Sequence, residues 1–189
     1  MTPKQVERVK NKIKKIKAAL SADKKHWGGF YHDGQGLRYL PPQLYIQIDD
    51  ITGGLRYFNW FNKNFPDDSC YPDFLFEWTI ILFKTGRQKE AEKKAFQLFC
   101  SDKDLFYKIV GHSNSTITDE EFIDSYINEL KNKECLSEFK TWLDKLTSSE
   151  KFIHLCNKYI DIKKRFQTEQ DEETEEYLTK QLKQLENGE

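Results

Sequence analysis

The first 25 residues combine one apolar stripe with a strongly basic remainder. Thr2 before Pro3 is a typical helix start, because proline is favoured at the first helical position and a hydroxyl caps free amides. The stripe recurs at spacings of three and four, the period of one helix face, and comprises Val6, Val9, Ile13, Ile16 and Leu20. We predict a basic helix over 1–25. It either lies on the body of its own chain, or serves as an interface with a second copy or an anionic partner.

Residues 26–41 interrupt the helical pattern. Glycine and proline mark turns, and this segment contains Gly28, Gly29, Gly34, Gly36 and Pro41. It also carries four rings, which are Trp27, Phe30, Tyr31 and Tyr39. Because aromatic side chains bury a large apolar area, we predict an ordered loop that folds back over the body.

Helical spacing returns between residues 42 and 110. The predicted helices cover 42–48, 51–64, 72–84 and 88–100, because proline favours the first turn of a helix and glycine its end. Turns at 49–50, 66–69 and 85–86 separate them. The aspartate pairs 49–50 and 67–68 fall at two of these turns, where we expect them to bond backbone amides rather than to perform acid–base chemistry.

The two predicted helix pairs are similar to each other at an offset of 37 residues, so that Gly54, Phe58 and Phe61 correspond to Ala91, Ala95 and Leu98. The stretches DITGGLRYFNWFNKNFP and LFKTGRQKEAEKKAFQLF resemble the second half of a tetratricopeptide repeat. Asp49 replaces the turn glycine of the repeat, a Pro-Pro pair falls inside the first helix, and the second copy lacks the terminal proline. The resemblance covers about 42–100 and implies an all-α stack of antiparallel helical hairpins with N- and C-terminal capping helices.

The resemblance also implies a short groove that binds a protein or peptide. The first helix of each pair lines such a groove, and here this concerns Tyr45, Gln47, Glu77, Ile80 and Lys84. Arg38, Tyr39 and Arg56 would join its wall, since arginine and tyrosine are favoured at binding hot spots. The alternative is that these residues only pack the hairpins or meet solvent.

The remainder, 111–189, also reads as helical. A loop over 111–116 precedes a capping box at Thr118 and Glu121. Helical stripes follow over 122–130, 136–146 and 152–166, with His154 expected on an apolar face. From Thr168 the chain becomes acidic, and we expect a last helix with an acidic first turn, the alternative being a disordered tail. We expect a single domain overall.

Composition excludes several functional classes. The chain has 189 residues, with 30 Lys and Arg against 31 Asp and Glu. A net charge of −1 argues against a nucleic-acid binder, which normally carries a basic excess. No apolar run is long enough to span a membrane, and no secretory signal is visible. The four cysteines are widely spaced, so we expect free thiols in the cytoplasm and no metal or cofactor.

Catalytic motifs are not apparent in the sequence. The loop contains His26, His32, Asp33 and Arg38, but their spacing matches no hydrolase or metal motif. We therefore favour a non-enzymatic module that binds a protein or peptide. The first alternative is a homo-oligomeric structural or adaptor protein that uses the N-terminal helix. The second is an enzyme with a site around 26–38.

Overall fold

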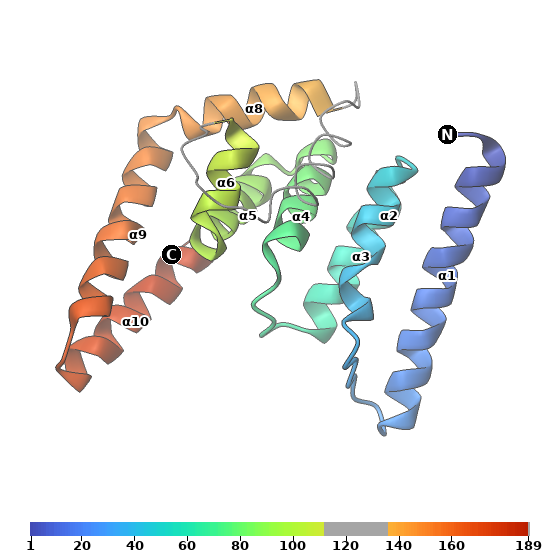
Figure 1. Cartoon of the computed structure of the whole chain (residues 1–189), viewed down its shortest axis with the longest axis horizontal. Coiled ribbons are helices and arrows are strands. Elements are labelled where there is room, and N and C mark those ends of the chain that lie inside the picture. The colour runs from blue at the N-terminus through green and yellow to red at the C-terminus, as the bar shows by residue number, and fades with distance from the viewer. Residues whose placement is uncertain (112–135, 189) are drawn as a thin grey trace. The chain divides into compact units, whose positions relative to one another are not determined.

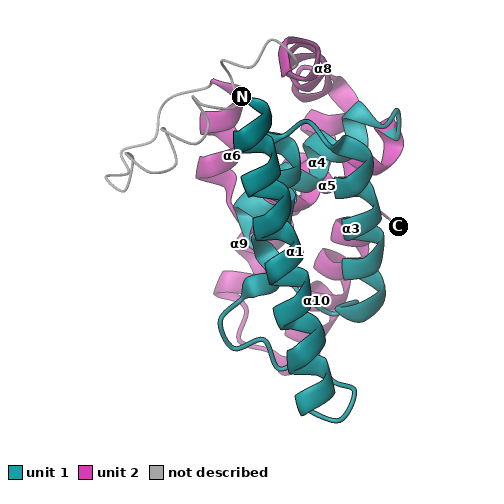
Figure 2. Cartoon of the chain, turned by 90° about the vertical axis from the view of Figure 1, so that its right-hand side faces the viewer, with its two compact units in different colours: residues 1–87 teal, residues 88–189 magenta. Residues whose placement is uncertain are grey.

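The computed structural model describes residues 1–111 and 136–188, and over these ranges it is helical without any strand. The prediction of an all-α fold is therefore confirmed. The expected capping box at Thr118 and Glu121 and the stripe over 122–130 lie outside the described residues, as do His112 and Cys135. The chain forms two units, 1–87 and 88–189 (Figure 2). The division falls between the two helices that we expected to form the second repeat-like hairpin.

The helices of the first unit follow the predicted boundaries closely (Figure 1). They are α1 (Pro3–His26), the 3₁₀ helix η1 (Leu37–Tyr39), α2 (Pro41–Gln47), α3 (Ile51–Asn64) and α4 (Pro72–Lys84). At the start of α1 the Thr2 side chain accepts a bond from the Gln5 amide, and the Gln5 side chain accepts one from the Thr2 amide. This reciprocal capping box satisfies amides that the first helical turn leaves unpaired.

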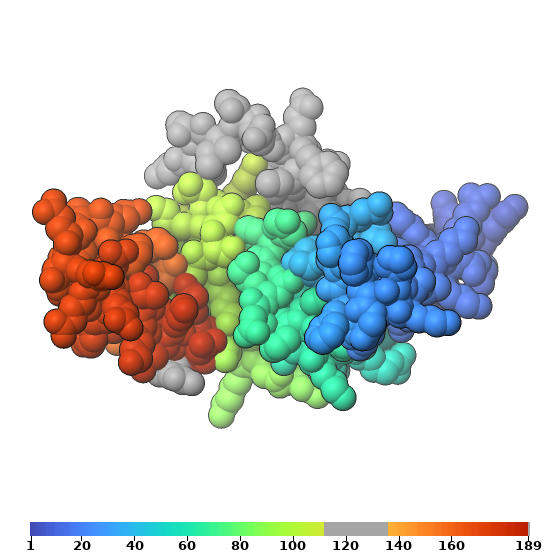
Figure 3. Space-filling model, turned by 90° about the horizontal axis from the view of Figure 1, so that it is seen from below, coloured from blue at the N-terminus to red at the C-terminus, as the bar shows by residue number. Residues whose placement is uncertain are grey.

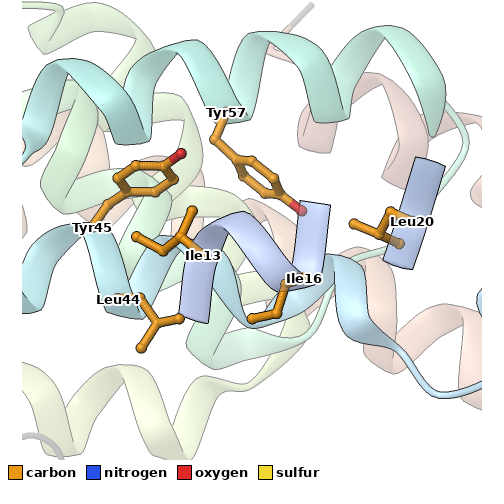
Figure 4. Close-up of a cluster of buried hydrophobic side chains, with 6 residues drawn as sticks. All are labelled: Ile13, Ile16, Leu20, Leu44, Tyr45 and Tyr57. Carbon is orange, nitrogen blue, oxygen red and sulfur yellow. The ribbon is translucent and has the colours of Figure 1, made fainter. Parts of the chain in front are cut away.

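The apolar stripe of α1 is buried within its own chain. Ile13, Ile16 and Leu20 pack against Leu44 and Tyr45 of α2 and against Tyr57 of α3 (Figure 4). Val9 is partly buried at the edge of this cluster, and Val6 is half-buried. The structure therefore shows the first of the two predicted arrangements, in which the stripe packs on the body of its own chain.

A second part of this unit is built from stacked rings between α3 and α4. Phe58 lies parallel to Trp78 with ring centroids 4.5 Å apart, and Phe61 lies 4.6 Å from Phe74. Gly54 of α3 allows this close approach, because a side-chain carbon there would collide with Ile81 of α4. The small residue that the repeat pattern singled out at 54 is thus required by packing.

The second unit contains five described helices. They are α5 (Gln88–Ser101), α6 (Lys103–Val110), α8 (Ser137–Thr147), α9 (Glu150–Thr168) and α10 (Glu172–Asn187). Phe96, Phe99 and Phe106 form its aromatic core with Phe152 and Tyr159 of α9. The side chains of α9 and α10 form one continuous surface in the space-filling view (Figure 3). The acidic end is helical, as we expected.

One expectation about local structure is wrong, and another holds only in part. His154 is exposed rather than buried, because the inward positions of α9 are Phe152, Cys156 and Tyr159, and 154 points away from that face at 100° per residue. The loop over 26–41 folds back only in part, since Tyr31 packs inward while Trp27 and Phe30 are 50% and 79% exposed.

Candidate functional site

A polar cluster centred on Arg38 contains several of the residues that the sequence singled out. The Arg38 guanidinium lies 2.9 Å from Asp68 through Nε and 3.0 Å from Asp33 through Nη1. Its Nη2 donates to the Tyr39 hydroxyl at 2.9 Å, and that hydroxyl donates to Asp68 at 2.7 Å. The guanidinium also lies 5.1 Å from the centre of the Phe65 ring. Charge, hydrogen bonding and stacking therefore hold Arg38 in one position.

Two carboxylates brace the loop around this cluster, one from α1 and one from the loop itself. Asp23, near the end of α1, accepts bonds from the backbone amides of His32 and Asp33 at 2.8 and 3.1 Å. Asp33 is buried and in turn accepts from the amides of Leu37 and Arg38 at 2.9 and 3.0 Å. Because each carboxylate satisfies two amides, the loop has a defined backbone although it contains no long helix.

The titration of the cluster reflects these bonds. Burial alone would raise the pKa of the Asp68 carboxyl, but hydrogen bonds from Tyr39, the Cys70 amide and Arg38 outweigh it, so that this pKa lies below its ordinary value. Burial and the bond to Asp68 raise the pKa of the Tyr39 hydroxyl well above its ordinary value. The cluster thus holds a fixed ion pair and a neutral phenol at physiological pH, and these bonds connect the loop to the turn between α3 and α4.

The exposed tip of the same loop presents two large rings to solvent. Trp27 and Phe30 flank Gly28 and Gly29, whose φ angles of 65° and 103° lie in the left-handed region that favours glycine. The Trp27 ring stacks on His32 at 5.0 Å and meets His26 edge-on at 5.1 Å. We call Trp27, Phe30, His26 and His32 the aromatic tip.

Tyr31 anchors the aromatic tip to the body. Its ring lies 5.6 Å from Trp60 and 5.1 Å from Phe65, and the Lys24 ammonium lies 4.7 Å from its centre. Together with the bonds from Asp23, this contact fixes the chain on the C-terminal side of the tip. The exposed rings are therefore carried by a braced turn between a helix end and a packed tyrosine.

The exposed face of α1 is strongly basic. The helix contains nine Lys and Arg against two acidic residues, Glu7 and Asp23, and all of the basic residues except Lys24 are exposed. Asp23 is used by the loop, as described above. With its apolar stripe buried, α1 offers solvent a face of ammonium and guanidinium groups that leads towards the aromatic tip.

The eight residues expected to line a groove do not share one surface. Tyr45, Glu77 and Ile80 are buried, Ile80 with 0% exposure, so their side chains present no surface to a ligand. Lys84 pairs with Asp49 at 3.1 Å. Arg56 is exposed, and Gln47 is half-buried. Arg38 and Tyr39 contact each other, and that contact braces the loop.

The residues of the enzymatic alternative divide into two groups. Asp33 and Arg38 form the ion pair of the polar cluster, whereas His26 and His32 pack on Trp27. The Asp33 carboxylate is already bonded to two amides and to Arg38. Across 1–111 and 136–188, no group of three or more His, Cys, Asp and Glu residues is placed to hold a metal ion.

Sequence reasoning missed two of the carboxylates that hold the loop in place. In the sequence, Asp23 is one more charged residue of a basic helix, and Asp68 is an ordinary aspartate of a turn. Asp68 does bond the Cys70 amide at 2.9 Å, as a turn aspartate would. Its bonds to Arg38 and Tyr39 span about 30 residues, and no local pattern encodes such a pairing.

Comparison with known proteins gives no match: no family model, no curated protein and no solved structure matches this chain. None of the helices in the described part of the chain is both long and apolar enough to cross a membrane.

Proposed function

We propose that this chain is a non-enzymatic protein that binds an acidic segment of another protein, using the aromatic tip and the basic face of α1. The single observation that carries the proposal is the exposure of Trp27 and Phe30 on a loop whose backbone is braced by Asp23 and Asp33. This surface differs from the groove expected from the repeat resemblance, because three of the groove residues are buried.

Exposed rings on a braced loop suit recognition. Aromatic residues are enriched among the few residues that dominate binding energy, and two exposed rings three residues apart offer a partner apolar area. Holding the loop in one conformation before binding lowers the conformational entropy lost on association. The bonds from Asp23 and Asp33 and the packing of Tyr31 supply that order.

Charge defines the chemistry of the partner. Seven more basic than acidic residues on one 24-residue helix create a positive potential along about 36 Å. Such a surface attracts acidic chains, raises their association rate and makes binding sensitive to salt. The fitting partner is therefore an acidic segment with one or two apolar side chains that meet Trp27 and Phe30.

A protein partner is favoured over a lipid surface by the packing of α1. Helices that lie in a membrane interface bury their own apolar face among the acyl chains. In α1 that face is occupied by Leu44, Tyr45 and Tyr57. Insertion at this surface would therefore rely on Trp27 and Phe30 of the tip, and an anionic membrane is the competing outcome of the test below.

We also propose that 42–100 is related to tetratricopeptide repeats and that the protein is located in the cytoplasm. Support for the first comes from the packing requirement at Gly54 and the full burial of Ala91, both small positions of the pattern. Support for the second comes from the free thiols of Cys100 and Cys156.

The test uses random peptides displayed on phage and selected against the full chain. We expect enriched sequences to combine Asp and Glu with an aromatic or large aliphatic residue. Fluorescence anisotropy then compares one enriched peptide on the wild type, on Trp27→Ala/Phe30→Ala and on Tyr177→Ala. Tyr177 is an exposed ring on α10 and serves as the matched control.

The double variant should bind the selected peptide at least tenfold more weakly, while Tyr177→Ala binds as the wild type does. Affinity should also fall as salt is raised, because the basic face contributes. Equal affinity for the wild type and the double variant would refute the proposal. So would a failure to enrich acidic peptides combined with co-sedimentation of the chain with vesicles rich in phosphatidylserine.

A further inference from the structure

A hollow in the second unit combines an apolar floor with a basic rim. It lies between α5, α6 and α9, and its volume is about 310 Å³. Phe99, Tyr159 and Ile160 supply apolar surface, while Lys103, Lys163 and Lys164 supply three ammonium groups. The lysines come from the first turn of α6 and from one end of α9. We propose that this hollow binds a small organic anion with an aromatic or aliphatic body.

The floor of the hollow is fixed. The Tyr159 hydroxyl donates to the Cys100 carbonyl at 3.2 Å and contacts the Glu186 carboxylate at 3.4 Å. The Phe99 ring packs on Tyr159 and on Phe106 at centroid distances of 6.2 and 5.5 Å. Because these side chains are tied to α5, α6 and α10, the hollow exists before a ligand arrives, as small-molecule sites commonly do.

The lysines of the rim are open to solvent, and one of them, Lys163, lies with its ammonium 6.0 Å from the centre of the Phe166 ring. All three are exposed, and none takes part in an ion pair within the described parts of the chain. Ammonium groups converging from two helices on one hollow favour a carboxylate, sulfonate or phosphate over a neutral ligand.

The lysines gather at the hollow although the second unit as a whole is acidic. Between 88 and 189 acidic residues outnumber basic ones, and four exposed glutamates crowd the start of α10, at 172, 173, 175 and 176. The lining of the hollow nevertheless includes three lysines. The lining contains no Asp or Glu.

Size limits the ligand further. An apolar cavity of about 150 Å³ takes up one benzene ring, so 310 Å³ accommodates about two fused rings or an aliphatic chain of similar volume. A dinucleotide or a folded peptide element is too large. The ligand class is thus a one- or two-ring organic acid, or a short fatty acid, with its charge at the rim.

The probe for this site is 2-naphthoate, compared with the uncharged 2-naphthamide by isothermal titration calorimetry on the full chain. The two ligands share the rings and differ in charge. We expect 2-naphthoate to bind at least tenfold more tightly, with an affinity that decreases as salt is raised. Octanoate, tested by competition against 2-naphthoate, distinguishes an aliphatic from an aromatic preference for the body of the ligand.

Variants locate the binding. Lys163→Gln/Lys164→Gln and Lys103→Gln should each weaken 2-naphthoate binding, the first by tenfold or more, and leave 2-naphthamide unaffected. Lys158→Gln, on the exposed face of α9 and outside the hollow, is the matched control and should bind as the wild type does. All are surface substitutions, so circular dichroism should show unchanged folding.

Three results would overturn the assignment. They are no heat of binding for 2-naphthoate at millimolar concentration, equal binding of the acid and the amide, and an equal effect of the Lys158 and Lys163/Lys164 substitutions. The site is in a different unit from the aromatic tip, so each proposal can fail without the other.

Discussion

At the scale of single residues, Asp68 illustrates how one side chain can serve two purposes. As a turn residue it bonds the Cys70 amide, and as a long-range partner it bonds Arg38 and Tyr39. The second role places the aromatic loop against the turn between α3 and α4. Removing the charge therefore acts on the loop, the element that carries the proposed binding surface.

Asp68→Asn should lower the free energy of unfolding by about 1–3 kcal/mol, because charge-assisted bonds to Arg38 and Tyr39 are weakened. Urea unfolding at pH 7 measures the change. Asp67→Asn is the matched control, since Asp67 is exposed at the adjacent position, and it should stay within about 0.5 kcal/mol of the wild type.

The pH dependence of that difference follows from the depressed pKa of Asp68. A carboxyl whose pKa is lower in the folded state stabilises the fold above its ordinary value of 3.8, and this contribution is lost as pH falls through the folded pKa. The gap between wild type and Asp68→Asn should thus be constant between pH 5 and 7 and shrink below about pH 4. A gap that widens in acid would contradict the ion pair.

At the scale of elements, the contact between α3 and α4 depends on Gly54. Alanine there gains about 1 kcal/mol of helix propensity but collides with the terminal carbon of Ile81, a side chain that is fully buried in the core. Overpacking costs about 1–3 kcal/mol, so we expect a net loss of stability in thermal unfolding. Asn59→Ala, on the exposed side of α3, should instead be neutral or slightly stabilising.

A double-mutant cycle tests the proposed cause. The atom in conflict is the terminal carbon of Ile81, which valine lacks. If the collision destabilises the variant, Gly54→Ala should lower the free energy of unfolding less in an Ile81→Val background than in the wild type. Equal costs in both backgrounds would mean that the glycine is needed for something other than this contact.

The packing of α1 gives a second prediction at this scale. Leu20 is 2% exposed at the contact with the body, and truncation to alanine should cost about 2–5 kcal/mol. Lys17→Ala, at an exposed position of the same helix, is expected to change stability by less than about 0.5 kcal/mol. Chemical denaturation of both variants, with tryptophan fluorescence as the signal, decides between a packed and a detached helix.

Local signals explain why so many elements could be predicted from the sequence. Thr2–Pro3, Pro72 and Gly86 mark helix ends by their own backbone chemistry, and the stripe of α1 has one clear period. α6 was not separated from its surroundings, although Asp102 caps it through the Leu105 amide. Its eight residues are too few for a periodic pattern to stand out.

The candidate site could be predicted only in part, because it depends on distant pairing. Arg38 and Tyr39 were singled out for their residue types, and the structure joins them to Asp68. The role of the loop depends on Asp23 and Asp33 bonding its amides, which a composition of glycines and rings does not reveal. Residues chosen by analogy with a repeat groove, such as Ile80, instead lie in the core.

At the scale of the whole molecule, opposite charges lie at the two ends of the chain. α1 is basic, and the first turn of α10 is acidic. Pairing of these ends between two copies would compete with an acidic partner for the same basic face. Exposed pairs contribute little, however, and are screened by salt. Self-association through charge should therefore be weak.

Measuring the oligomeric state at two salt concentrations distinguishes charge pairing between copies from an apolar interface. Light scattering coupled to size exclusion should give a mass of 22.5 kDa at low salt and again at about 0.5 M salt, where screening acts within a few ångströms. We expect a monomer because the stripe of α1, the apolar surface best suited to a dimer, is covered by Leu44, Tyr45 and Tyr57 of the same chain. A dimer that dissociates at high salt would mean that the basic face of α1 is occupied by another copy. A dimer unaffected by salt would require an apolar interface and would revive the adaptor alternative.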